Sequence, residues 1–153
     1  MGAYLNENRC SFAYWNAVAA AVEMAHKKGV KVIAWIDPTE GHAGNHTRWA
    51  LRHPEFTLQR RDGRREDGYY ADPIISLAYP EVVEFRLAML REVLSFGVHG
   101  VFLVATADMV GYEPPTSESF IAKHGIDPRD VADDDPRRIE HQAEFLTAYG
   151  QNS

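Results

Sequence analysis

The chain has a single cysteine and no long apolar run. Cys10 is alone among 153 residues, so no intrachain disulfide can form, and its polar surroundings supply no base that would activate the thiol. The longest apolar stretches, around residues 30–36 and 98–107, are far shorter than a membrane span. The first residues also lack the basic segment and apolar stretch of a signal peptide. The sequence therefore predicts a soluble chain without a membrane partner or a targeting segment, and it leaves the cellular location unknown.

Clustered positive charge is scarce as well. The formal net charge is -6, whereas affinity for nucleic-acid backbones is built mainly from clustered Lys and Arg. One basic run carries four arginines within residues 60–65, but Asp62, Gly63, Glu66 and Asp67 interrupt or follow it. We interpret this run as a solvated turn and expect no nucleic-acid partner.

Several short motifs of known chemistry are missing. No glycine-rich phosphate loop follows either of the apolar stretches, and neither a Gly-x-Ser-x-Gly elbow nor a Cys–His pairing is evident. Nucleotide binding and acyl transfer therefore rank low, and we expect no cofactor.

The main pattern in the sequence is a pair of apolar stretches. An amphipathic helix that ends in glycine precedes each of them. A helix over residues 12–28 leads through Gly29 to a strand over 31–36, and a helix over 80–95 leads through Gly97 to a strand over 98–104. Because apolar residues fill the first strand without strict alternation, we expect it to be buried on both faces, as in parallel sheets covered by helices. The pattern indicates an α/β fold with parallel strands in one domain, and the remaining expected elements are a short strand at 74–78 and helices near 47–52, 117–124 and 136–149.

Several segments in this order resemble proteins of the family described as "family 10 glycosylhydrolase". The resemblance rests on AHKKGVKVIAWID (Ala25–Asp37), YPEVVE (Tyr79–Glu84) and GVHGVFL (Gly97–Leu103), and on GYEPP, HGIDP and HQAEFLTAY further along. It implies a (β/α)8 (TIM-like) barrel, which typically needs about 250 residues. Residues 1–153 would then form a single domain that is a partial barrel, a fragment of a larger one.

The sequence departs from this family at one strand. Members usually show an Asp-Gly pair entering the strand and an Asp near its end, whereas this chain has His99-Gly100 and Val104 at the corresponding places. No arginine follows Val104 to hold a substrate. Because both acids are replaced, we expect weak or absent glycosidase activity.

Four carboxylates follow the two strands and are the catalytic candidates. Glycoside hydrolysis generally uses two carboxyl groups, and in a barrel these lie at the carboxyl ends of strands. Asp37 and Glu40 follow the first strand, and Asp108 and Glu113 follow the second. Each except Glu40 has a simpler alternative: Asp37 as a turn former, Asp108 as a helix cap or loop ion pair, and Glu113 as a solvated loop carboxylate.

Histidines and aromatic residues near the same strand ends are candidate substrate-binding groups. We expect His42 and His46 to suit sugar hydroxyls, and Tyr112 to offer a stacking surface. Trp35 lies within the strand, so it either packs in the core or contacts substrate. We predict no metal, because the spacing of the two histidines suits a metal only on a helix, and Gly44 argues against one there.

Three functions remain open from the sequence alone. The first is a glycoside-hydrolase-like domain that acts on or binds a poly- or oligosaccharide. The second is an inactive carbohydrate-binding or truncated barrel remnant, and the third is a metal-dependent hydrolase using Asp37, Glu40, His42 and His46. Because half a barrel leaves sheet edges and apolar faces uncovered, we also expect a homo-oligomer or a marginally stable monomer.

Overall fold

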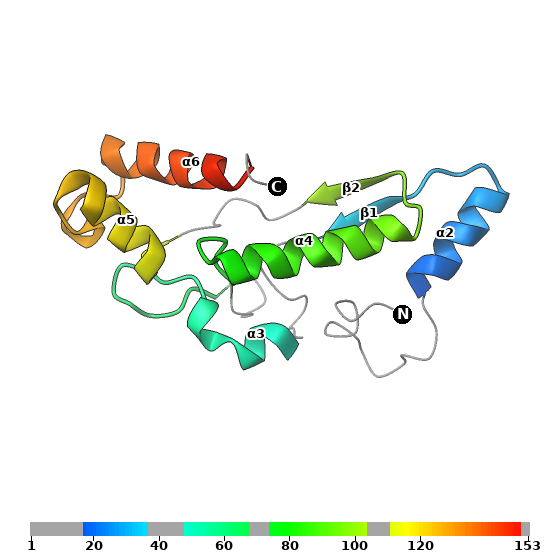
Figure 1. Ribbon diagram of the computed structural model, residues 1–153, viewed down its shortest axis with the longest axis horizontal. Coiled ribbons are helices and arrows are strands. Elements are labelled where there is room, and N and C mark those ends of the chain that lie inside the picture. The colour runs from blue at the N-terminus through cyan, green and yellow to red at the C-terminus, as the bar shows by residue number, and fades with distance from the viewer. Residues whose placement is uncertain (1–16, 37–47, 68–73, 104–110, 151–153) are drawn as a thin grey trace.

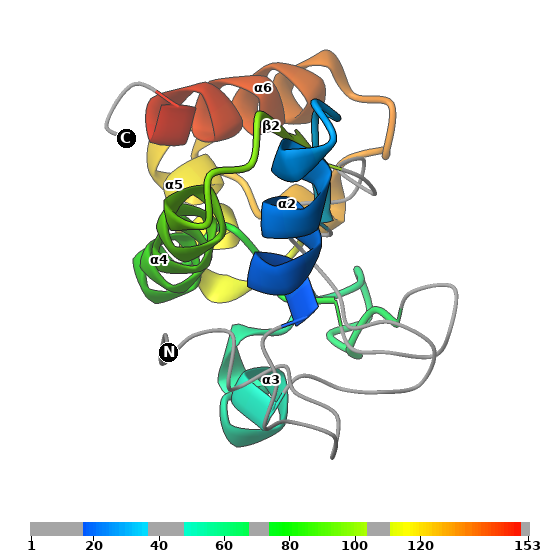
Figure 2. The same ribbon diagram turned by 90° about the vertical axis from the view of Figure 1, so that its right-hand side faces the viewer.

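The computed structural model describes residues 17–36, 48–67, 74–103 and 111–150. Within these ranges helices alternate with two short strands, and α4 runs alongside the strands while α5 and α6 gather at the far end from α2 (Figure 1). In both views α3 and α6 lie on opposite sides of the molecule (Figure 2). The elements are α2 (Ala17–Lys27), β1 (Ile33–Ile36), α3 (Arg48–Arg52), the 3-10 turn η1 (Pro54–Phe56), α4 (Pro80–Ser95), β2 (Gly100–Leu103), α5 (Pro114–His124), the 3-10 turn η2 (Pro128–Asp130) and α6 (Pro136–Gly150).

The two strands pair side by side and in parallel, which confirms the predicted orientation. Ile33 is the register partner of Gly100, and Trp35 is the partner of Phe102. A parallel pair requires a crossover connection, and here the chain between the strands contains α3, η1 and α4. The predicted strand at 74–78 does not enter this sheet; it forms one isolated antiparallel bridge, between Ile75 and Thr57.

The sequence predicts that the first strand is buried on both faces, and this prediction is wrong. Ile33, Trp35 and Phe102 have exposed fractions of 58%, 75% and 55%. Because side chains alternate along a strand and these three occupy matching register positions, they share one face of the sheet. The described helices leave this face open to solvent, although its apolar composition suits a covered sheet.

Helix α4 begins and ends where the sequence predicts. Pro80 occupies its first turn, where a missing N–H costs nothing, and Gly97 follows its end with φ of 81°, a conformation that favours glycine. Its buried stripe consists of Val82, Phe85, Arg86, Met89 and Val93.

The apolar core lies between α3, η1, the segment 74–79 and α4. Ala50, Ile75 and Val82 form its centre. Trp49 stacks on Phe85 with ring centroids 4.5 Å apart, and such aromatic pairs contribute beyond the area that they bury. The core therefore sits beside the sheet rather than on both of its faces.

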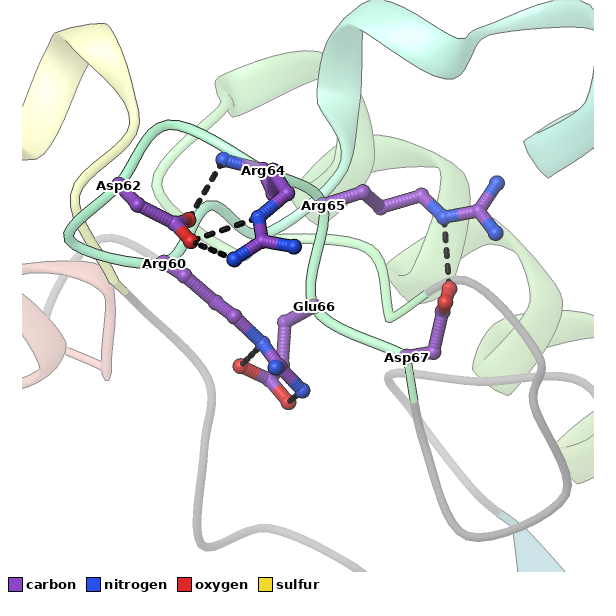
Figure 3. Close-up of polar contacts among 6 residues, drawn as sticks. All are labelled: Arg60, Asp62, Arg64, Arg65, Glu66 and Asp67. Carbon is purple, nitrogen blue, oxygen red and sulfur yellow. Dashed lines mark hydrogen bonds and ion pairs between the residues drawn. The ribbon is translucent and has the colours of Figure 1, made fainter.

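The basic run forms the exposed turn that the sequence predicts. Arg60 donates to both carboxylate oxygens of Glu66 at 2.6 Å, while Arg64 pairs with Asp62 and Arg65 with Asp67 (Figure 3). Each of these three arginines is matched by an acid of the same segment, so they offer no uncompensated charge to a phosphate.

Candidate functional site

Most of the predicted catalytic and binding residues lie outside the described residues. These are Asp37, Glu40, His42, His46 and Asp108. Val104, which stands where the resembled family has an acid, lies outside them too. The structure does describe Glu113, Trp35 and Tyr112.

Glu113 is fully buried, with an exposed fraction of 0%, and its carboxylate accepts hydrogen bonds from four residues. The backbone N–H of Gly111 donates to its two oxygens at 2.9 and 3.0 Å, and the Thr116 hydroxyl donates at 3.1 Å. The Ser76 hydroxyl and, at 3.4 Å, the Gln59 N–H complete the set. With no exposed atom and with donors on both oxygens, this placement favours a structural role over the catalytic one predicted for Glu113.

The carboxylate of Glu113 also influences Tyr79, which precedes α4. Burial, and next to it the negative charge of Glu113, raise the pKa of Tyr79 to about 12. Both effects oppose a phenolate in this region, because burial disfavours any charge and the carboxylate of Glu113 disfavours a negative one. Tyr79 therefore stays neutral at physiological pH and acts as a packing group.

A close backbone approach holds the segment of Glu113 against the turn segment. The Tyr112 N–H donates to the Gln59 carbonyl at 2.9 Å. At the preceding residue, Gly111, an added Cβ atom would lie 2.5 Å from that same carbonyl oxygen. Only glycine fits there without a shift of the backbone, which explains the residue at this position.

Tyr112 is buried and fully engaged. Its hydroxyl donates to Asp133 at 2.6 Å and accepts from Arg61 at 3.3 Å. The guanidinium of Arg138 lies 4.5 Å from the ring centroid, and that of Arg129 lies 5.8 Å from it. These contacts occupy the ring and the hydroxyl, so they favour a packing role over the sugar-stacking role predicted for Tyr112.

Asp133 is the shared acceptor of this cluster. It accepts from Tyr112, from Arg138 and, at 3.0 Å, from Arg61. The hydrogen bond from Tyr112, followed by those of the arginines, lowers the pKa of Asp133 to about 2. It is therefore ionised at physiological pH, and it links the exposed turn to the α5–α6 region as a hydrogen-bond acceptor rather than as a proton donor.

Trp35 is the predicted binding residue that the structure leaves available. Its exposed fraction of 75% rules out the core alternative. Its indole meets the ring of Phe102 edge to face, with centroids 5.7 Å apart. Phe102 is a candidate binding residue that the sequence reasoning missed, although two aromatic residues at equivalent strand positions were a signal that could have found it.

His99, at the place of an acid in the resembled family, holds the start of β2 to the chain before β1. The backbone N–H of His99 donates to the Val32 carbonyl at 2.8 Å, and the ring Nδ1 of His99 accepts from the Val32 backbone N–H at 3.2 Å. The imidazole thus supplies an acceptor to the backbone, as a carboxylate in the same place would. Its ring also meets that of His26 edge to face, with centroids 5.0 Å apart.

The described part of the chain has no group of three or more His, Cys, Asp or Glu side chains that could hold a metal ion. The four residues of the metal-hydrolase alternative all lie outside that part. None of the helices in the described ranges is long and apolar enough to cross a membrane.

Comparison with solved structures shows that the fold resembles part of two α-galactosidases. The α-galactosidase from Lactobacillus brevis superposes with a TM-score of 0.53 at 15% identity, over 87% of this chain and 16% of that one. TtGalA, an α-galactosidase from Thermus thermophilus solved with p-nitrophenyl α-D-galactopyranoside, gives 0.50 at 18% identity, over 87% of this chain and 24% of that one. The chain thus spans less than a quarter of the length of these enzymes and shares a fold with that part.

No protein-family model and no curated protein matches the sequence. The structural likeness shows a fold shared with part of these two α-galactosidases, and in this chain it contains a small parallel sheet. The likeness does not single out family 10. The resemblance to that family therefore stays a prediction.

Proposed function

We propose that this chain is part of a (β/α)8 barrel of the glycoside-hydrolase type and that it binds a poly- or oligosaccharide. The observation that carries the proposal is the exposed aromatic pair Trp35 and Phe102, set on neighbouring parallel strands of a glycosidase-like fold. Aromatic rings with open faces suit the apolar faces of sugar rings. The open face of the sheet in this partial barrel is therefore the proposed binding surface.

Hydrolysis depends in this proposal on Asp37, Glu40 and Asp108. Asp37 and Glu40 follow β1, and Asp108 follows β2, so they come after the carboxyl ends of the two strands, where barrel enzymes carry their catalytic groups. Glu113 is the weakest of the four candidates because its carboxylate is buried and bonded. With Val104 in place of the usual acid, we propose that binding outweighs turnover. His42 and His46 are proposed to contact sugar hydroxyls.

The proposal predicts that Trp35→Ala weakens saccharide binding by about fivefold, since one stacking ring contributes about 1 kcal/mol. Calorimetric titration would measure this, with p-nitrophenyl α-D-galactopyranoside and a panel of oligosaccharides as ligands. Phe102→Ala should weaken binding too. Ile139→Ala removes from α6 an apolar side chain that is about as exposed as Phe102, and it should leave the affinity unchanged.

Two results would separate the alternatives. If no saccharide of the panel binds the unmodified chain, the proposed function is wrong. If nitrophenol is released rapidly and Asp108→Asn or Glu40→Gln abolishes the release, the chain is an active glycosidase and the expectation drawn from Val104 is wrong.

The same sheet face underlies a second proposal, on association, in which a second copy of the chain and a saccharide would compete for it. Ile33, Trp35 and Phe102 expose a continuous apolar face, and exposed apolar sheet surface favours association. We expect light scattering to show a homo-oligomer, or else thermal unfolding to show a marginal monomer. A monodisperse monomer that melts above about 65 °C, the upper end of the usual mesophile range, would contradict this expectation.

A further inference from the structure

Two histidines meet in the interface between α5 and α6. Phe120, with an exposed fraction of 1%, contacts the rings of both His124 and His141, at centroid distances of 4.5 and 5.4 Å. The two imidazoles are 6.5 Å apart, and Phe145 meets His141 at 5.9 Å. The interface between the helices is thus an aromatic cluster that contains two groups able to gain charge near neutral pH.

His141 is buried, with an exposed fraction of 4%. Its Nε2 lies 3.1 Å from the Ser119 hydroxyl, which can either donate or accept. That hydrogen bond therefore survives protonation, and the cost of charging His141 comes from its surroundings. Burial, and after it the nearby His124 and Lys123, lower the pKa of His141, while Glu144 opposes them.

His124 is the second histidine of this cluster. Its Nε2 is buried and has no hydrogen-bond partner among the described residues. His124 thus contributes a ring contact to the interface, 4.5 Å from the ring of Phe120, and no hydrogen bond from that nitrogen.

Most of the other charged groups around this interface are engaged in pairs, although Glu144 also favours a protonated His141. Lys123 and Glu144 already pair with each other at 2.6 Å, and η2, which packs against α5, brings Asp127 and Arg129, which pair at 3.5 Å. The remaining charged groups on the packed elements are Glu118 on α5, Arg137, Arg138 and Glu140 on α6, Asp130 on η2 and, before α6, Asp135, which pairs with Arg137.

We infer that the α5–α6 helix pair is a pH-sensitive element, in which protonation of the buried His141 at mildly acidic pH loosens the contact between the two helices. The chemistry requires no ligand, since burial beside Phe120 and Phe145 already favours the neutral imidazole of His141. The loosened element includes the part of α6 that carries Arg138, and through Asp133 this helix is joined to Tyr112, which follows β2 in the chain.

The direction with pH follows from linkage. A histidine whose pKa is lower in the folded state than the ordinary 6.5 binds its proton more readily when the helices are open. The contribution of His141 to stability is fully present above 6.5, and it is lost as the pH falls below that value toward the folded-state pKa. Acid should therefore open this helix pair before it titrates Asp133 or Asp135, whose pKa values lie near 2.

Hydrogen exchange measured by NMR on the full chain tests this inference. Between pH 7.5 and 5, protection factors of α6 amides, corrected for intrinsic exchange rates, should fall severalfold, while those of α4 stay level. His141→Phe keeps an aromatic ring among Phe120 and Phe145 and should abolish the fall. His26→Phe alters an exposed histidine on α2 and should leave the fall as in the unmodified chain.

Two outcomes would overturn the inference: α6 protection that does not change with pH, or a fall that is equally large in His141→Phe. Should that variant fail to fold, the histidine ring signals of the unmodified chain decide. A His141 ring that titrates at or above 6.5 refutes the inference, and one that titrates below 6.5 together with loss of α6 protection supports it.

Discussion

Replacing Glu113 with alanine should lower the free energy of unfolding by about 3 kcal/mol or more. The substitution removes a fully buried carboxylate. The N–H of Gly111 and the hydroxyls of Ser76 and Thr116 then lose the acceptor to which they donate. A buried donor left unsatisfied costs about 1–3 kcal/mol, and hydrogen bonds to a charged group are stronger than neutral ones. Since small domains are stable by only about 5–15 kcal/mol in total, this change should bring the chain close to unfolding.

Urea unfolding followed by circular dichroism would measure the loss. Glu118→Ala is the matched control, because it removes an exposed glutamate from α5, the helix that Glu113 precedes, and should change stability by no more than about 0.5 kcal/mol. Glu113→Gln keeps one acceptor oxygen and should cost less than alanine. If Glu113→Ala were as stable as the control, the structural role assigned to this carboxylate would be wrong. A stable Glu113→Gln variant that lost saccharide turnover would restore the catalytic prediction.

The sequence predicts those parts of the fold that depend on local signals. Pro80 and Gly97 define α4 because a proline suits a first helical turn and a glycine suits the left-handed residue after the last. The two β-strands follow helices that end in Gly29 and Gly97, and their parallel pairing follows from that order. Gly125 ends α5 in the same way, with φ of 70°. These features need only a few neighbouring residues, so the sequence alone carries them.

Burial could not be predicted in the same way. An apolar run such as that of β1 indicates a covered strand, but coverage depends on which elements reach both faces of the sheet. Trp35 is exposed because the described helices do not cover its face, and nothing within the run itself reveals this. The sequence thus predicts strand β1 correctly, but it does not predict the tertiary packing that decides the burial of this strand.

The role of Glu113 depends on partners that are distant in sequence. Ser76 and Gln59 precede it by 37 and 54 residues, and both reach its carboxylate. From sequence, a glutamate beside a proline after a strand suits a solvated loop or an active site equally well. Tyr112 is a similar case, since its contacts with Arg61 and Asp133 span 51 and 21 residues. Long-range polar clusters of this kind leave no periodic pattern from which they could be inferred.

Two phenylalanines of this chain offer a direct measure of how unevenly its stability is distributed. Phe120 has an exposed fraction of 1% in the α5–α6 interface, whereas Phe102 has 55% on the open face of the sheet. Truncating a buried phenylalanine costs about 3–5 kcal/mol, because the lost transfer energy adds to that of the cavity left behind. Phe120→Ala should therefore destabilise the chain by about that amount. Phe102→Ala should cost at most about 1 kcal/mol, mainly through its lost contact with Trp35.

Urea unfolding at a protein concentration low enough to keep the chain monomeric compares the two variants without interference from association. At higher concentration the difference between the two losses in stability should become smaller if the open sheet face binds a second copy, because Phe102 is then buried and its truncation costs more. Equal losses for both variants in the dilute monomer would mean that the sheet face is covered in solution by part of the chain itself. In that case Trp35 would be unavailable, and the proposed saccharide surface would have to be sought elsewhere.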